Sequence, residues 1–141
     1  LTGAKTLSYG PNLAASLAAR RTGADDALLI ARDGSVLEGP TYSVAWMVGD
    51  RLETPGIDLG ILESITRTVA LEVAPECGLE VHEGTFPLER VLAADEVVAL
   101  STLKEVTPVS HVGDHQFVVG KRSAQLAAAF SEVVRRELAL D

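Results

Sequence analysis

Apolar residues recur at helical spacing in several parts of the chain. After Gly10-Pro11-Asn12, leucine and alanine repeat every three or four residues until Gly23, which predicts a helix with Pro11 in its first turn. The same spacing predicts a helix over 63–74 and a final amphipathic helix over 123–138. A shorter helix is expected over 87–94.

Short apolar runs between turn signals predict strands among these helices. Residues 27–31 form a continuous apolar run, typical of a strand buried on both faces, and Asp33-Gly34 predicts a tight turn into a return strand. The other expected strands cover 36–38, 42–48, 51–54, 79–82 and 96–100, and a hairpin joins 105–112 to 116–119 around Gly113-Asp114. Because helices and strands alternate without a repeat or linker, residues 1–141 are predicted to form one α/β domain.

Composition narrows the classes of function. The 141 residues are 47% apolar and carry a net charge of −8, which argues against nucleic acid as a partner because phosphate binding needs a basic surface. No apolar run reaches the length of a membrane span, so a membrane is not an expected partner either. The single cysteine, Cys77, excludes an intrachain disulfide and fits a reducing compartment, so we expect a cytoplasmic protein. Cys77 itself is interpreted as a buried bystander, with a catalytic thiol as the alternative.

Two charged residues are candidates for cofactor chemistry. Lys5 is the only charged residue between Leu1 and Ala19, which is compatible with a buried amine whose lowered pKa makes it nucleophilic. Glu38 follows an expected strand and precedes Gly39-Pro40, where a carboxylate can pair with a protonated ring nitrogen of a cofactor. The alternatives are a solvated lysine near a terminus and an ordinary exposed acid at a strand end.

Two further segments are suited to binding phosphate. Residues 60–67 lead from a loop into a helix, and free N–H groups at a helix N-terminus bind phosphate; the alternative is ordinary capping by Ser64. Ser101-Thr102 ends a buried strand, and its hydroxyls are either phosphate donors or part of a hydrogen-bonded turn. No metal site is expected, because metal-ligand spacing is absent among His82, His111 and His115.

Together, and in this order, these segments resemble the class IV pyridoxal-phosphate aminotransferases. That family includes branched-chain and D-amino acid aminotransferases and aminodeoxychorismate lyases. The resemblance extends over nearly the whole chain, to about Gly120. It is carried by residues 5–12, 23–29, 33–39, 54–55, 60–62, 65–67, 94–97, 101–102 and 105–109.

The resemblance implies a role for each matching residue. Lys5 is expected to be the Schiff-base lysine, which also moves the proton between the substrate α-carbon and the cofactor C4′. Glu38 is expected to pair with the pyridine nitrogen and keep it protonated. Tyr9 would hydrogen-bond the phenolic oxygen of the cofactor, and Leu62 would pack against its ring. The phosphate is expected to be bound by Ile65, Thr66, Ser101 and Thr102.

The resemblance also implies the fold and the activity. The expected fold is α/β, a mixed-sheet pseudo-barrel flanked by helices. The expected activity is transfer of an amino group between an amino acid and a 2-oxo acid, with pyridoxal 5′-phosphate as cofactor. Residues 101–109 resemble the transaminase form of their loop. The alternatives are an aminodeoxychorismate lyase that releases pyruvate and a truncated domain that binds the cofactor without catalysis.

The sequence departs from the family pattern at the rim of the site. Ser43 stands where asparagine is usual, and Glu63-Ser64 where glycine or proline is frequent. Family members also have an N-terminal domain that supplies a phosphate-binding arginine, part of the substrate pocket and much of the dimer contact. Only four residues precede Lys5 here, and Leu1 is not methionine. Residues 1–141 are therefore expected to be the C-terminal cofactor domain of a homodimeric enzyme, without its N-terminal domain.

Overall fold

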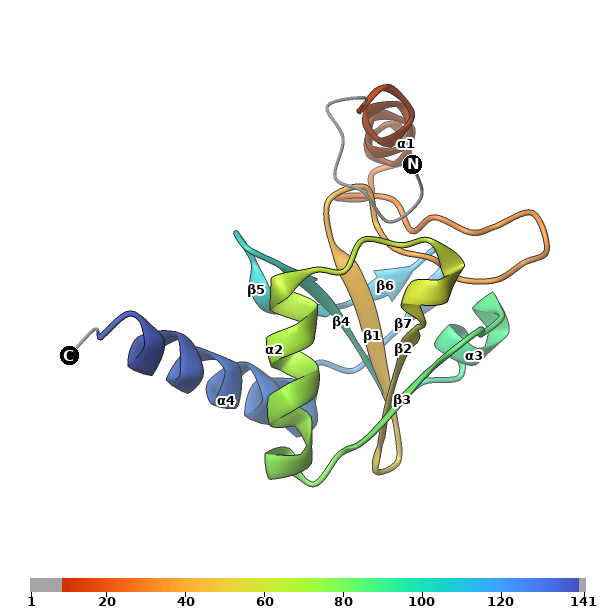
Figure 1. Ribbon diagram of the computed structural model, residues 1–141. Helices are drawn as coiled ribbons and strands as arrows, with labels where there is room; N and C mark the ends of the chain where they lie inside the picture. Colours follow the sequence, from red (N-terminus) through yellow and green to blue (C-terminus); the bar gives the residue numbers. More distant parts are fainter. Residues whose placement is uncertain (1–8, 140–141) are drawn as a thin grey trace.

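Helices and strands alternate along the described part of the chain. The computed structural model describes residues 9–139 (Figure 1). With η denoting a 3-10 helix, the elements are α1 (Gly10–Arg21), β1 (Ser43–Val48), β2 (Arg51–Pro55), η1 (Ile57–Leu59), α2 (Ile65–Val73), η2 (Ala74–Cys77), β3 (Glu80–Gly84), α3 (Leu88–Leu92), β4 (Glu96–Ser101), β5 (Glu105–Val109), β6 (His111–Val112), β7 (His115–Gln116) and α4 (Lys121–Glu137).

Five strands form one mixed sheet in the order β3-β2-β1-β4-β5. β1 pairs antiparallel with β2 and with β4, in registers that place Trp46 opposite Glu53 and Ser43 opposite Leu100. β4 and β5 are also antiparallel, whereas β2 and β3 run parallel. Because parallel strands need a long crossover connection, the chain passes from β2 to β3 through α2 and η2. The predicted α/β fold with a mixed sheet is confirmed.

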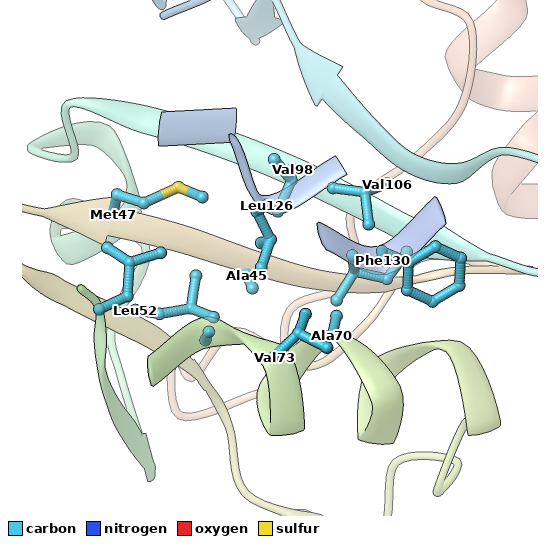
Figure 2. Close-up of a cluster of buried hydrophobic side chains, with 12 residues drawn as sticks. Ala45, Met47, Leu52, Ala70, Val73, Val98, Val106, Leu126 and Phe130 are labelled. Carbon is cyan, nitrogen blue, oxygen red and sulfur yellow. The ribbon is translucent and has the colours of Figure 1, made fainter. Parts of the chain in front are cut away.

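Side chains of β1 alternate between two apolar clusters, because successive residues of a strand point to opposite faces of the sheet. The first cluster packs beneath α2 and α4, and its members include Ala45, Met47, Ala70, Leu126 and Phe130 (Figure 2). The second cluster packs against α3 on the opposite face, and its members include Val44, Trp46, Val91, Val97 and Phe117. Both faces of the central strands are therefore buried, which accounts for their nearly continuous apolar sequence.

The prediction of a doubly buried strand at residues 27–31 was wrong. Only Ile30 forms a strand-like bridge, with Val36, and the Ile30 side chain is 38% exposed. The run does turn back as expected, since Gly34 has a φ of +90° in the predicted turn. The two segments pair with each other outside the five-stranded sheet, with the Leu37 N–H donating to the Leu29 carbonyl at 2.9 Å. An apolar run predicts an extended segment but does not identify its partners, and these set its burial.

The expected hairpin of 105–112 with 116–119 forms only around its turn. β6 and β7 pair about Gly113-Asp114, whereas residues 105–109 pair with β4 as strand β5. Val118 and Val119 follow β7 outside any strand, and they are 73% and 59% exposed. The predicted turn is confirmed, and the predicted length of the ladder was wrong.

One end of the sheet collects the segments that the sequence marks for chemistry. Strand β1 begins at this end, and β2, β3 and β4 finish there, as their pairing directions require. The 3-10 helix η1 and the loop after it lead directly to the start of α2. Figure 1 shows α1 beyond this end, at the top of the view. We call this edge the α1 end of the sheet.

Candidate functional site

Glu38 lies in the segment that leads into β1, and its carboxylate contacts the loop before α2. The Leu62 N–H donates to both carboxylate oxygens, at 3.3 Å to Oε1 and 3.2 Å to Oε2. The side chain is half-buried. This burial raises the pKa of the Glu38 carboxyl above its usual value, and the Leu62 N–H opposes the rise. The Glu38 carboxyl is thus partly desolvated, and a nearby cation would stabilise its charged form.

The turn after Glu38 holds this carboxylate in place and requires glycine. The Gly39 N–H donates to the Tyr42 carbonyl at 2.8 Å, and a Cβ atom on Gly39 would lie 2.0 Å from the Tyr42 ring. The Tyr42 hydroxyl donates to the Ala27 carbonyl at 2.7 Å. Burial, with a smaller contribution from Asp26, raises the pKa of Tyr42 to about 12. Tyr42 is therefore neutral, and its hydrogen bonds hold the backbone next to Glu38 in place.

Helix α1 is tied to the same turn, which brings Tyr9 to this end of the sheet. Asn12 in the first turn of α1 donates from Nδ2 to the Pro40 carbonyl at 2.8 Å. Tyr9 occupies the N-cap position of α1, and its carbonyl accepts the Leu13 N–H at 2.8 Å. Its side chain is 39% exposed, and its hydroxyl makes no hydrogen bond within residues 9–139. Lys5, the expected Schiff-base residue, lies outside the described residues.

The start of α2 presents backbone N–H donors. Ser64 is the N-cap, and its Oγ accepts the Arg67 N–H at 3.4 Å, while its carbonyl accepts the Thr68 N–H at 2.9 Å. Within residues 9–139 the N–H groups of Ile65 and Thr66 have no acceptor, as expected for the first turn of a helix. Capping by Ser64 and free donors therefore occur together, although the sequence presents them as alternatives. The Ile65 side chain is 84% exposed, whereas Thr66 is buried.

Ser101 and Thr102 mark the end of β4 at the same end of the sheet. Ser101 is half-buried, and its Oγ accepts the Lys104 N–H at 3.2 Å, so the turn interpretation holds for this hydroxyl. Thr102 is exposed in the turn that leads to β5. Glu105 closes this turn with a φ of +51°, in the left-handed region that favours glycine.

Some of the candidate residues are joined by hydrogen bonds in the structure, and others only share one end of the sheet. Glu38 contacts Leu62, three residues before the α2 start at Ile65, and Asn12 joins α1 to the turn after Glu38. Ser101 and Thr102 share this end of the sheet through the pairing of β4 with β1, but no hydrogen bond joins them to the described part of α2. The sequence offered no signal for the Leu62 backbone contact, because Leu62 was expected to act through its side chain.

The described residues offer partners for two parts of pyridoxal phosphate, its ring nitrogen and its phosphate. Glu38 has one N–H donor among residues 9–139 for its two oxygens, which leaves acceptor capacity for a protonated ring nitrogen. The free N–H groups at the α2 start can receive phosphate oxygens, as the helix dipole favours. Within residues 9–139 no group of three His, Cys, Asp or Glu side chains is arranged to hold a metal ion.

Comparison with known proteins identifies the family. The model for the amino-transferase class IV family matches residues 1–112. A D-alanine aminotransferase of Listeria monocytogenes is 36% identical over 135 residues, which are 94% of this chain and 46% of that protein. The aminodeoxychorismate lyase of Bacillus subtilis is 31% identical over 113 residues, 80% of this chain and 38% of that protein. The chain spans less than half the length of these curated relatives.

Solved structures agree with the sequence relatives. The branched-chain amino acid aminotransferase from Thermobaculum terrenum, in its PLP form, superimposes with a TM-score of 0.89 at 35% identity, over 94% of this chain and 45% of that chain. The fold IV transaminase CpuTA1 from Curtobacterium pusillum also gives a TM-score of 0.89, at 28% identity, over 99% of this chain and 46% of that chain. None of the described helices is long and apolar enough to span a membrane. The chain belongs to the class IV aminotransferases.

Proposed function

We propose that this chain provides the cofactor-binding part of a pyridoxal-phosphate-dependent aminotransferase acting on an amino acid and a 2-oxo acid. The observation that carries the proposal is the partly buried Glu38 carboxylate, which accepts the N–H of Leu62, three residues before Ile65 and the free N–H donors of α2. Bound pyridoxal phosphate supplies a protonated ring that accepts electron density from the substrate α-carbon. The chain's own residues would bind, orient and protonate this ring.

Glu38 would hold the ring nitrogen. A half-buried carboxylate resists ionisation when no cation pairs with it, and among residues 9–139 none pairs with Glu38, whose pKa is raised. A protonated nitrogen placed against its free lone pairs would reverse this preference, and the pair would stabilise both charges. The Leu62 N–H would meanwhile fix the orientation of the carboxylate.

The α2 start would hold the phosphate. The chain from Leu62 to Ile65 can span about 10 Å at most, at roughly 3.3–3.6 Å per residue. This span suits a pyridine ring whose nitrogen faces Glu38 and whose phosphate arm faces the N–H groups of Ile65 and Thr66. Additional donors to the phosphate would be the hydroxyls of Thr66, Ser101 and Thr102.

Lys5 and Tyr9 complete the proposed set. Lys5 Nζ would bind the cofactor aldehyde as a Schiff base and carry the proton between the substrate α-carbon and the cofactor C4′. Tyr9 would donate to the phenolic oxygen, and its place at the α1 end of the sheet is compatible with this role. Family membership and the order of these residues along the chain support both assignments.

The remaining proposals concern the whole enzyme. We assign residues 1–141 to the C-terminal cofactor domain of these enzymes, because the match covers about 45% of the solved relatives. Substrate binding would then also need an N-terminal domain like that of the relatives, and a homodimer is proposed on the same family grounds. A cytoplasmic location is proposed because the single Cys77 fits a reducing compartment.

An absorbance titration with pyridoxal phosphate tests the proposal. The chain has three lysines, so Lys104→Ala and Lys121→Ala serve as matched controls for Lys5→Ala. We expect a visible band with the unaltered chain and both controls, and loss of that band with Lys5→Ala. A band that persists in Lys5→Ala, or that never forms, would contradict the assignment.

A second candidate activity is that of an aminodeoxychorismate lyase. The Bacillus subtilis enzyme of this name is among the relatives, at 31% identity. Both activities would use the same cofactor residues, so the residues of the site do not distinguish one activity from the other. The discriminating assay compares release of pyruvate from aminodeoxychorismate with amino transfer to 2-oxoglutarate, using a full-length protein that carries this domain. We expect the transfer reaction to dominate, because residues 101–109 resemble the transaminase form of the loop.

A further inference from the structure

Arg67 is a buried cation in the first turn of α2. The residue is only 3% exposed, and it directly follows Thr66. Its Nη2 donates to the Pro55 carbonyl at 2.9 Å and to the Glu83 carboxylate. Its backbone N–H donates to Ser64 Oγ. Burying an arginine is costly unless its charge and donors are satisfied, so these contacts mark a specific structural requirement.

The contacts of Arg67 join α2 to the two parallel strands of the sheet. Pro55 ends β2, and Glu83 lies next to the last residue of β3. These strand ends are also joined directly, since the Gly56 N–H donates to the Gly84 carbonyl at 2.9 Å. One guanidinium nitrogen therefore ties the helix that follows β2 to the carboxyl ends of both strands. We call these contacts the Arg67 clamp, since they join the first turn of α2 to both strand ends.

One donor of the same guanidinium has no acceptor among residues 9–139. Arg67 Nε is buried and makes no hydrogen bond within the described residues. Its ionic partner Glu83 has a side chain that is 45% exposed, so water screens the negative charge more than the positive one. With one donor unsatisfied and its ionic partner screened by water, the guanidinium charge is only partly compensated in the first turn of α2, where the N–H groups of Ile65 and Thr66 are free.

We propose that Arg67 is a positioning residue that holds the first turn of α2 where its N–H groups receive the cofactor phosphate. The inference rests on the proposed function, since it concerns the phosphate end of the same site. It assigns Arg67 no contact with the cofactor. It predicts that disturbing the clamp weakens recognition of the phosphate while leaving the reaction of the aldehyde with lysine intact.

The test compares pyridoxal phosphate with pyridoxal, which has the same aldehyde and ring but no phosphate. Absorbance titrations of the 141-residue chain give a dissociation constant for each, and their ratio reports the phosphate preference. Internal cyclisation of free pyridoxal affects every variant equally and does not alter comparisons between variants. Arg67→Met removes the clamp and the charge, and we expect the preference to fall about tenfold, as for loss of a favourable anion–helix interaction.

Glu83→Gln provides a milder variant that distinguishes positioning from simple charge. Because Glu83 is partly exposed, this change is compatible with folding, and it loosens the clamp while keeping Arg67. Positioning predicts that the phosphate preference falls by about threefold, the scale of one screened ion pair. A charge effect alone predicts the opposite, because removal of a negative group should strengthen anion binding. An unchanged or increased preference in Glu83→Gln would overturn the proposal.

Arg90→Met is the matched control on the other face of the sheet. Arg90 in α3 donates from Nε to the buried Glu53 carboxylate at 2.7 Å, so its loss also breaks an ion pair that anchors a helix. We expect this variant to lower the melting temperature without altering the phosphate preference. If Arg90→Met reduces the preference as much as Arg67→Met does, the effect is general loosening and the proposal fails. If the unaltered chain has no phosphate preference, the proposed function itself fails.

Discussion

Glu38 meets two opposing demands at the scale of a single residue. Under the proposed function, half of the carboxylate is buried so that it can lie against a ring nitrogen, and that burial disfavours the charged form before any ring is bound. The Gly39 turn and the Leu62 N–H nevertheless hold the Glu38 carboxylate in this half-buried position. A partly desolvated carboxylate of this kind lowers the stability of the folded chain at neutral pH.

Replacing Glu38 with glutamine should therefore stabilise the cofactor-free chain at neutral pH. Glutamine keeps an oxygen for the Leu62 N–H and removes the partly buried charge. Since the folded pKa of Glu38 is raised, its protonated form contributes stability below the ordinary value of 4.5 and loses it as the pH rises through the folded pKa. Thermal unfolding should show a higher melting temperature for Glu38→Gln at pH 7 and no difference at pH 4. A lower melting temperature at pH 7 would show that the folded chain already satisfies the charge.

Glu105 is a second residue whose conformation carries a cost. Its φ of +51° lies where side chains other than glycine are strained. We expect Glu105→Gly to raise the free energy of unfolding by about 0.5–1 kcal/mol, after the greater flexibility of glycine in the unfolded chain is subtracted. Urea denaturation measures this change, and Glu105→Ala is the control, because alanine keeps the Cβ atom and should give no gain.

Among the candidate site residues, those whose residue type itself carries the chemistry were visible in the sequence. Glu38 stood out as an acid at a strand end, and Thr66 as a hydroxyl at a helix start, both reinforced by their order along the chain. The Leu62 N–H left no trace in the sequence, because every residue except proline has that group. Arg67 was visible within the Ile-Thr-Arg segment, but its two strand-end partners depend on the fold.

At the scale of elements, α4 is held to the sheet by an acid from another strand. Glu96 at the start of β4 accepts the Arg122 N–H at 3.2 Å and the Ser123 N–H at 2.8 Å, so it caps the first turn of α4 from outside the helix. Burial raises the pKa of Glu96, but these hydrogen bonds outweigh the burial, so the pKa lies below its usual value. Gly120 permits the close approach, since a Cβ there would lie 2.2 Å from Glu96 Oε1.

Removing this cap should destabilise the whole domain. We expect Glu96→Ala to cost about 2 kcal/mol, because buried N–H groups lose a charged acceptor. Since the folded pKa is lowered, the contribution of Glu96 is present above the ordinary value of 4.5 and is lost as the pH falls through the folded pKa. Urea denaturation should therefore show a difference from the unaltered chain at pH 7 that shrinks below pH 4.

A double-mutant cycle isolates the contact with Gly120. Gly120→Ala should destabilise the unaltered chain, because the added methyl displaces the carboxylate. It should cost much less in the Glu96→Ala background, where that carboxylate is absent. Equal costs in the two backgrounds would place the effect of Gly120 elsewhere.

Whole elements were predicted well where periodicity was long and less well where apolar runs were short. The helices expected over 63–74 and 123–138 are confirmed as α2 and α4, because a repeating apolar stripe identifies the buried face directly. The run at 27–31 carries no comparable signal, since five apolar residues do not show whether a sheet edge is available to receive them. The assembled sheet decides which strands pair and where a ladder ends, as the end of the ladder between β4 and β5 shows.

At the scale of the whole molecule, α1 differs from every other α-helix that the structure describes. It buries none of its residues, and Leu13 and Leu17 are 59% and 44% exposed. Its described tethers are polar: Asn12 donates to the Pro40 carbonyl, and Ser16 Oγ donates to Asp26 Oδ1 at 2.7 Å. A helix of 12 residues has little stability without packing, so we expect these two contacts to contribute to holding α1 in place.

Hydrogen exchange should show this difference directly. We expect amides of α1 to exchange at least about tenfold faster than those around Leu126 in α4, because few buried contacts oppose local opening. Asn12→Ala should accelerate exchange in α1 without altering α4. Equal protection of the two helices would show that α1 is held by contacts other than these tethers.

The pairing of β1 with β4 has a consequence for how the protein is made. Ser43 lies opposite Leu100, so the strand that follows Glu38 cannot complete its ladder until β4 has left the ribosome. Glu38 and the α2 start are synthesised early, and Thr102 arrives only with the hairpin that follows β4. A nascent chain that stops before β4 would leave one edge of β1 unpaired and the Trp46 cluster without Val97 and Phe117, and unpaired edges and exposed apolar surface favour aggregation. Under the proposed function, cofactor binding that involves Thr102 would accordingly begin only after β4 has emerged.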